Sequence, residues 1–111
     1  MEIVIQPESP PLRRDASGAL RVGQSRVLVE LVIHTFQDGA TPESIVQRYT
    51  TVTLEDIYAV IAYYLRHRED MEAYLAEREQ RAQDVRQRIE SSQGNLKDIR
   101  NRLLARHKQS A

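Results

Sequence analysis

The sequence predicts a mainly α-helical protein with a small N-terminal β-hairpin, a three-helix unit of the helix-turn-helix type and a C-terminal helical arm. Apolar residues recur at helical spacing in three segments between residues 28 and 65. A turn sequence separates two short extended segments near the N-terminus. At 111 residues, 41% hydrophobic and 29% charged, the chain allows one modest domain with an appendage.

Residues 1–11 are expected to form a short strand, "EIVI", and a proline-rich linker. The next segment, "LRRDASGALRV" at residues 12–22, predicts a β-hairpin. Asp15 and Ser17 can bond to their own backbone in the turn, and Gly18 supplies a position of positive φ. Residues 12–66 as a whole are expected to form the hairpin and the helix-turn-helix-like core.

Three helices are expected in that core, over residues 28–37, over residues 42–49 and from residue 54 onward. Thr41 and Thr53 suit the N-cap positions of the second and third helices. The third helix is apolar on almost every side, which predicts burial all round. Its second face, with Val60 and Tyr63, is then available to another chain and is our candidate dimer contact.

The helix-turn-helix outline raises the question of DNA binding. A reading helix offers polar or basic side chains to the bases, but the third helix opens with Glu55 and Asp56. If DNA is bound, the better candidates are the arginines of the hairpin region. These are Arg13, Arg14, Arg21 and Arg26. We prefer the simpler interpretation that they keep an exposed strand edge soluble.

Residues 67–111 are expected to form the helical arm. Ten of its positions follow a coiled-coil-like spacing of alternately four and three residues. They are Met71, Leu75, Arg78, Ala82, Val85, Ile89, Ser92, Leu96, Ile99 and Leu103. We expect a break near residues 92–95, because Gly94 suits a helix end and Asn95 suits the next N-cap. The alternative is one continuous helix that tolerates Gly94.

Residues 18–75 resemble a small bacterial family catalogued as a domain of unknown function, number 433. The resemblance rests on Gly23, Ser25-Arg26-Val27, Gly39-Ala40-Thr41-Pro42-Glu43, Ile45, Tyr49, Thr53-Leu54-Glu55-Asp56-Ile57, Ala62-Tyr63-Tyr64 and His67-Arg68-Glu69. The sequence departs from the family pattern at Ser25, where threonine is usual, and at Thr50, where proline is usual. Proline is also missing after Val27. The resemblance implies a homeodomain-like helical core.

The same resemblance implies an antitoxin role, because such proteins are often encoded beside PIN-like ribonucleases. Residues 94–111 carry five basic residues against one acid, a net charge of +4. We therefore expect the arm to bind the ribonuclease through Arg100, Arg102, Arg106 and Leu103. Two alternatives stay open: a DNA-binding regulator of its own operon, and a structural module that oligomerises through the arm.

Other classes of function are not expected. The chain has no cysteine, and His34, His67 and His107 lack metal-ligand spacing. We expect no catalytic residues, no cofactor, no metal and no small-molecule substrate. No secretory signal and no apolar run of about 18 residues is visible, so a cytoplasmic address without membrane contact is expected. The small core makes a homodimer the default expectation.

Overall fold

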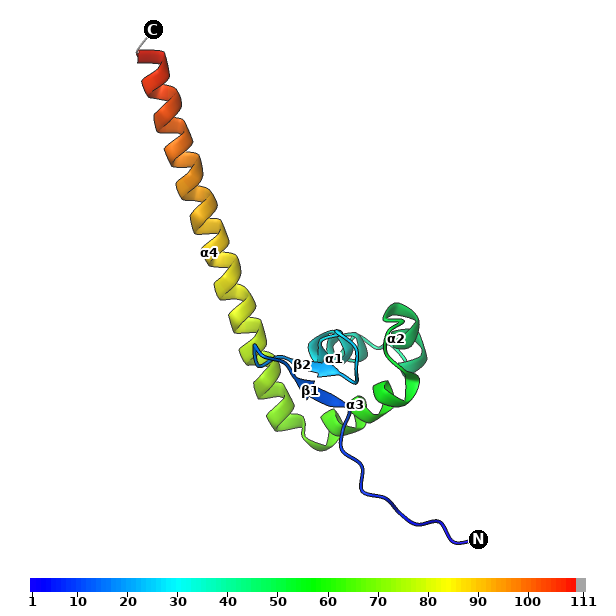
Figure 1. Ribbon diagram of the computed structural model, residues 1–111. Helices are drawn as coiled ribbons and strands as arrows, with labels where there is room; N and C mark the ends of the chain where they lie inside the picture. Colours follow the sequence, from blue (N-terminus) through cyan, green and yellow to red (C-terminus); the bar gives the residue numbers. More distant parts are fainter. Residues whose placement is uncertain (110–111) are drawn as a thin grey trace. The chain divides into compact units, whose positions relative to one another are not determined.

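The computed structural model describes the backbone of residues 1–109 and the side chains of residues 1–94 and 96–105. The elements are β1 (Leu12–Arg14), β2 (Leu20–Val22), α1 (Val29–Gln37), α2 (Pro42–Arg48), α3 (Leu54–Arg66) and α4 (Arg68–Gln109) (Figure 1). The predicted fold class is confirmed: the chain is mostly helical and opens with an antiparallel hairpin. It divides into two compact units, Met1–Met71 and the helix from Glu72 onward.

The hairpin forms where the turn chemistry predicts it. Strands β1 and β2 pair with Leu12 opposite Val22 and Arg14 opposite Leu20. The Asp15 carboxylate accepts hydrogen bonds from the Ser17 amide at 2.9 Å and from the Ser17 hydroxyl at 2.7 Å. It also accepts one from the amide of Ala19 at 3.0 Å. One aspartate therefore closes the whole turn.

A second tight loop follows β2 and leads into α1. The Ser25 hydroxyl donates to the carbonyl of Val22 at 2.6 Å and accepts from the Val27 amide at 3.1 Å. Gly23 has a φ of 56°, in the left-handed region that glycine favours. A Cβ atom there would lie 2.4 Å from a carboxylate oxygen of Asp56, in the first turn of α3. The loop therefore needs glycine both for its backbone and for its close approach to α3.

The starts of α2 and α3 confirm the predicted caps. The Thr41 hydroxyl accepts from the Ser44 amide, and the Thr53 hydroxyl accepts from the Asp56 amide, each at 3.2 Å. Each bond satisfies one of the amides that the first turn of a helix leaves without a partner. The two threonines therefore define where the second and third helices begin.

The core of the first unit lies among the hairpin and the first three helices. Its fully buried large side chains are Val22, Val29, Val32, Ile33, Ile45, Ile57 and Val60. The expectation that α3 is buried on all sides is wrong, because Tyr58 is 50% exposed and Leu65 is 49% exposed. Only the 57, 60, 61, 64 face of α3 is buried.

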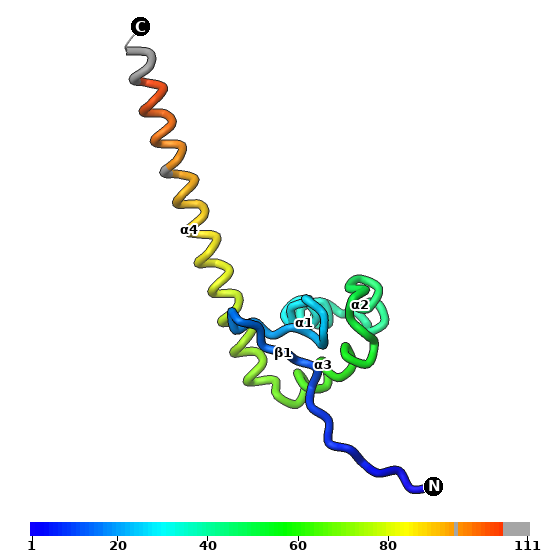
Figure 2. The backbone as a smooth tube through the Cα atoms, in the orientation of Figure 1, coloured from blue at the N-terminus to red at the C-terminus, as the bar shows by residue number. Residues whose placement is uncertain are grey.

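The N-terminal strand that we expected within residues 1–11 is absent. Residues 1–10 form an extended segment without regular structure (Figure 2). Ile3, Val4 and Ile5 are between 73% and 92% exposed. A strand needs a neighbouring strand for its hydrogen bonds, and β1 pairs only with β2 in the part of the chain that is described. High β propensity alone therefore does not make this segment a strand.

The break that we expected near residues 92–95 is also absent. Helix α4 is a single helix of 42 residues that passes through Gly94 (Figure 1). A glycine inside a helix costs about 1 kcal/mol relative to alanine. A break would instead give up several backbone hydrogen bonds and require a new helix start. None of the helices in the described residues is both long and apolar enough to cross a membrane.

Candidate partner-binding surfaces

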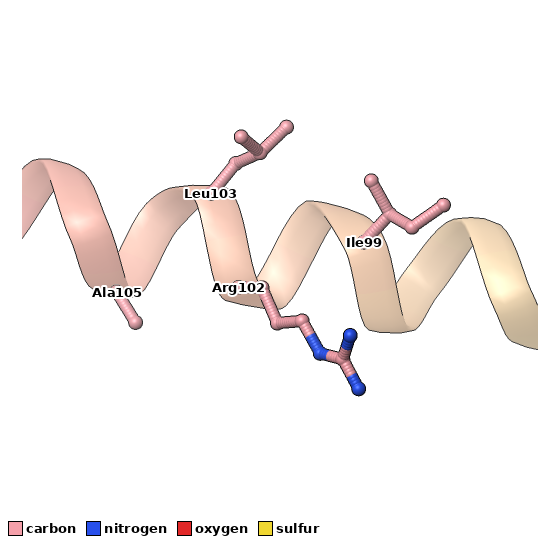
Figure 3. A pocket seen from close by; sticks show the side chains of 4 residues that line it. All are labelled: Ile99, Arg102, Leu103 and Ala105. Carbon is pink, nitrogen blue, oxygen red and sulfur yellow. The ribbon is translucent and has the colours of Figure 1, made fainter.

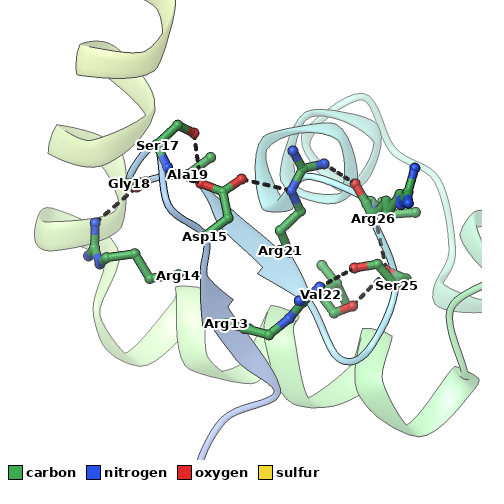
Figure 4. A network of polar contacts seen from close by, with 11 residues as sticks. Arg13, Arg14, Asp15, Ser17, Gly18, Ala19, Arg21, Val22, Ser25 and Arg26 are labelled. Atoms are coloured by element: carbon green, nitrogen blue, oxygen red, sulfur yellow. Dashed lines mark hydrogen bonds and ion pairs between the residues drawn. The ribbon is translucent and has the colours of Figure 1, made fainter.

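The arginines of the hairpin region mostly bind the chain itself. Arg13 donates to the Ser25 carbonyl at 2.8 Å, and Arg14 donates to the Gly18 carbonyl at 3.0 Å (Figure 4). Arg21 pairs with the Asp15 carboxylate at 3.0 Å and also donates to the Arg26 carbonyl. Arg26 itself is exposed and contributes its carbonyl oxygen to this network. These contacts tie the two loops together, a role that the sequence analysis did not assign to the arginines.

Asp15 is the electrostatic centre of this network. The hydrogen bond from the Ser17 side chain, together with the Arg21 guanidinium and the Ala19 amide, holds the pKa of Asp15 well below its usual range. Each of these groups stabilises the ionised carboxylate. Asp15 is therefore a structural anion of the hairpin.

The two candidate dimer residues on α3 have different surroundings. Val60 is fully buried, so the expectation that it faces another chain is wrong. Tyr63 is half-buried and stacks on the ring of His67, with ring centroids 4.3 Å apart. The stacking partner of Tyr63 was not predicted from the sequence, although the spacing of four residues could have indicated it. A surface depression next to the stack is lined by Glu8, Ser9, Pro10, Ala59, Ala62, Tyr63, Arg66 and His67.

Tyr58 is exposed but already bonded within the first unit. Its hydroxyl donates a hydrogen bond to the Glu43 carboxylate and so links α3 to α2. This bond lowers the pKa of Glu43 and raises the pKa of Tyr58. The pair therefore helps to hold the first unit together.

Helix α4 presents apolar side chains that nothing in the described structure covers. We call the seven positions from Ala82 to Leu103 that follow the 4,3 spacing the arm stripe. They are Ala82, Val85, Ile89, Ser92, Leu96, Ile99 and Leu103. All seven are exposed, and the large ones among them are exposed by 51% to 64%. Met71 and Leu75, which precede the arm stripe in the same spacing, are buried.

The candidate toxin-binding residues lie along the C-terminal part of α4. In the view of Figure 3, Ile99 and Leu103 point to one side of the helix and Arg102 points to the other. Arg102 lies 3.7 Å from Asp98, and both side chains are more than 70% exposed. Arg100 is also exposed. The backbone of Arg106 is helical, and its side chain lies outside the described residues.

The hairpin, the three short helices and the long helical extension define a small two-unit helical protein with an uncovered arm. Residues 14–64 match a family model described as "Protein of unknown function (DUF433)". Over these residues the chain is therefore similar to this family, which confirms the resemblance seen in the sequence. The match ends within α3, so the arm stripe lies outside it. No curated protein and no solved structure matches the chain.

Proposed function

We propose that this protein is the antitoxin of a bacterial toxin–antitoxin pair, and that it binds and inhibits a PIN-like ribonuclease in the cytoplasm through α4. The observation that supports this proposal is the exposed arm stripe. A helix that is polar on most sides gains most of its stability from packing its apolar side against another surface. Contiguous exposed apolar residues with a polar border typically mark a protein-binding site.

Burial of the arm stripe would supply much of the binding free energy. Full burial of a leucine or isoleucine side chain contributes about 1.5–3 kcal/mol. Leu96, Ile99 and Leu103 are each more than half exposed, so a partner can still gain most of this free energy. Part of the gain is offset by the ordering of side chains at the interface.

The arginines at the C-terminal end would supply the inhibition. The active site of a PIN-like ribonuclease resembles an acidic, metal-binding pocket. A guanidinium group matches carboxylates in a two-bond geometry and can take the place of the metal ion. In this proposal Arg100, Arg102 and Arg106 enter or border the pocket, and Leu103 anchors the helix beside it.

Truncation after Gly94 tests this proposal. The shortened chain should lose inhibition of the ribonuclease encoded beside its gene, because Leu96, Ile99, Leu103 and the terminal arginines are gone. Inhibition is measured as RNA cleavage against antitoxin concentration. Thermal unfolding of both chains is the control, because the first unit should melt at the same temperature. Unchanged inhibition by the truncated chain would exclude the arm as the inhibitory element.

The DNA-binding alternative receives less support. Arg13, Arg14 and Arg21 are already bonded within the hairpin region, although Arg13 and Arg14 are exposed, as Arg26 is. DNA binding stays a prediction, and steep loss of affinity with rising salt would support it. A homodimer also stays a prediction, without a contribution from Val60.

A further inference from the structure

The borders of the arm stripe carry charge of one sign. On a helix with this spacing, two rows of positions border the apolar side and would lie next to a partner helix or groove. Along residues 81–102, every charged residue in these two rows is arginine. They are Arg81, Arg86, Arg88, Arg100 and Arg102. All five side chains are exposed.

The acidic residues of the same segment lie elsewhere on the helix. Residues 80–105 contain Asp84, Glu90 and Asp98 as their only acids, and all three fall behind the arginine rows. The sixth basic residue of the segment, Lys97, also lies behind the rows. Helix α4 is therefore sorted into an apolar stripe, two arginine borders and a mixed back face. Charges that served only solubility would not need this order.

This order disfavours a second copy of the chain as the occupant of the stripe. Border residues of paired helices lie against each other and set partner choice. In a parallel pair, Arg81 of one copy would approach Arg86 of the other. In an antiparallel pair, the arginine rows would again face arginine rows. Like charges at such positions repel each other, so they destabilise a pair of α4 helices from two copies of the chain.

We propose that the arm stripe docks into an apolar groove of a different protein whose two rims carry carboxylates. The proposal rests on the proposed function, because both assign partner binding to α4, but it extends the contact from the C-terminal end to residues 81–103. Carboxylates of the groove rims would pair with the arginine borders in two-bond geometry. The apolar floor of the groove would cover Val85, Ile89 and Leu96.

The ion pairs within α4 do not prevent this docking. Arg81 lies 2.9 Å from Glu77, and Arg86 lies 3.2 Å from Glu79. These side chains are all more than half exposed, and exposed pairs of this kind contribute little stability. Their guanidinium groups are therefore available to a partner. Arg88 and Arg100 are also exposed.

A protein groove fits the arm stripe better than a nucleic acid does. Phosphate contacts would use the arginines but would leave the central aliphatic side chains in water. Val85, Ile89 and Leu96 are each more than half exposed, and a nucleic acid would leave this apolar surface uncovered. A protein groove with an apolar floor would bury it. An RNA oligonucleotide serves as a competitor in the test below.

The experiment uses the full-length protein and two synthetic helical peptides of about four heptads. Both peptides carry the same apolar seam, and one has glutamate at every border position where the other has lysine. Fluorescence anisotropy at low salt should show the glutamate peptide binding more tightly, by on the order of tenfold or more. Equal binding of the two peptides, or no binding of the glutamate peptide, would overturn the proposal.

A pair of variants separates border contacts from general charge attraction. Arg100→Glu and Lys97→Glu make the same change of charge three residues apart, but only Arg100 borders the stripe. Arg100→Glu should weaken glutamate-peptide binding several-fold more than Lys97→Glu. Circular dichroism checks that both variants stay helical. Equal losses would contradict the proposal, as would displacement of the peptide by a single-stranded RNA that binds more tightly.

Sedimentation of the full-length protein tests the second copy directly. The chain and its Ile89→Asp variant should sediment in the same oligomeric state, because α4 does not pair with itself. Dissociation of a larger species by Ile89→Asp would overturn the proposal. The outcomes are distinct from those of the ribonuclease test, because neither the peptides nor sedimentation involves the toxin. Inhibition that survives truncation after Gly94 would exclude the C-terminal end of α4 as the inhibitory element and leave the peptide result standing.

Discussion

Asp15 makes the stability of the hairpin dependent on pH. Its carboxylate accepts three hydrogen bonds from Ser17 and Ala19 and pairs with Arg21, so its pKa in the folded protein is well below its ordinary value of 3.8. A lowered folded-state pKa stabilises the fold at every pH above the unfolded-state value. The contribution falls as the pH drops below about 4 and is lost once the folded-state pKa is passed.

We therefore expect Asp15→Asn to lower the free energy of unfolding at neutral pH. The difference from the wild type should shrink steadily as the pH falls below about 4, because the wild-type carboxylate becomes protonated there. Urea unfolding at several pH values measures this difference. A Glu8→Asn variant is the control, because Glu8 lies in the extended N-terminal segment. A difference that is independent of pH would contradict the role of the ionised carboxylate.

Gly23 is the position where a single methyl group should do the most damage. A left-handed backbone costs a residue with a Cβ atom about 1–2 kcal/mol, and the Asp56 carboxylate would also have to move. Gly23→Ala should lower the free energy of unfolding by at least this amount, measured as the urea midpoint. An unchanged midpoint would mean that the loop between β2 and α1 relaxes without strain.

At the scale of elements, the continuity of α4 can be tested at Gly94. A Cβ atom there meets nothing within 4 Å, and the backbone is helical. Gly94→Ala should therefore stabilise the helix by about 1 kcal/mol and raise the helical signal in circular dichroism. Gly39→Ala is the matched control and should destabilise, because Gly39 has a φ of 99°. A fall in helicity of Gly94→Ala would instead support a helix end at this residue.

The elements whose signals are local could be predicted from the sequence. Thr41 and Thr53 each sit directly before a helix that they cap, and Asp15 sits in the turn that it closes. The buried face of α3 could not be predicted in the same way, because Tyr58 and Leu65 are as apolar as the residues that are buried. Which face is covered depends on where α1, α2 and the hairpin pack.

The errors at the N-terminus and at Gly94 have a common physical origin. Residue propensities favoured a strand at "EIVI" and a helix end near Gly94, but each outcome depends on hydrogen-bond partners along the backbone. Among the described residues, no neighbouring strand is available to pair with "EIVI". A helix end near Gly94 would cost backbone hydrogen bonds that the continuous helix keeps. Propensity is a weak guide where the hydrogen-bond pattern decides.

At the scale of the whole molecule, the two units differ in how much of their apolar and charged side chains is covered or bonded within the chain. The first unit has a buried core, and Arg13, Arg14 and Arg21 of its hairpin region bond to groups of the same unit. Helix α4 leaves the arm stripe and its arginine borders exposed. The apolar spacing of the arm was visible in the sequence, but its arginine borders were missed, although the positions on either side of that spacing could have indicated them.

Binding of a ribonuclease by the C-terminal part of α4 is tested most directly by co-purification from the organism that encodes the protein. The tagged full-length chain and the chain truncated after Gly94 would be purified at moderate salt, and the proteins that accompany them identified by mass spectrometry and assayed for RNA cleavage. We predict a stoichiometric small ribonuclease, inactive in the complex, that accompanies only the full-length chain. The claim would be contradicted if both chains retained the same ribonuclease, or if the full-length chain came down with no protein but itself.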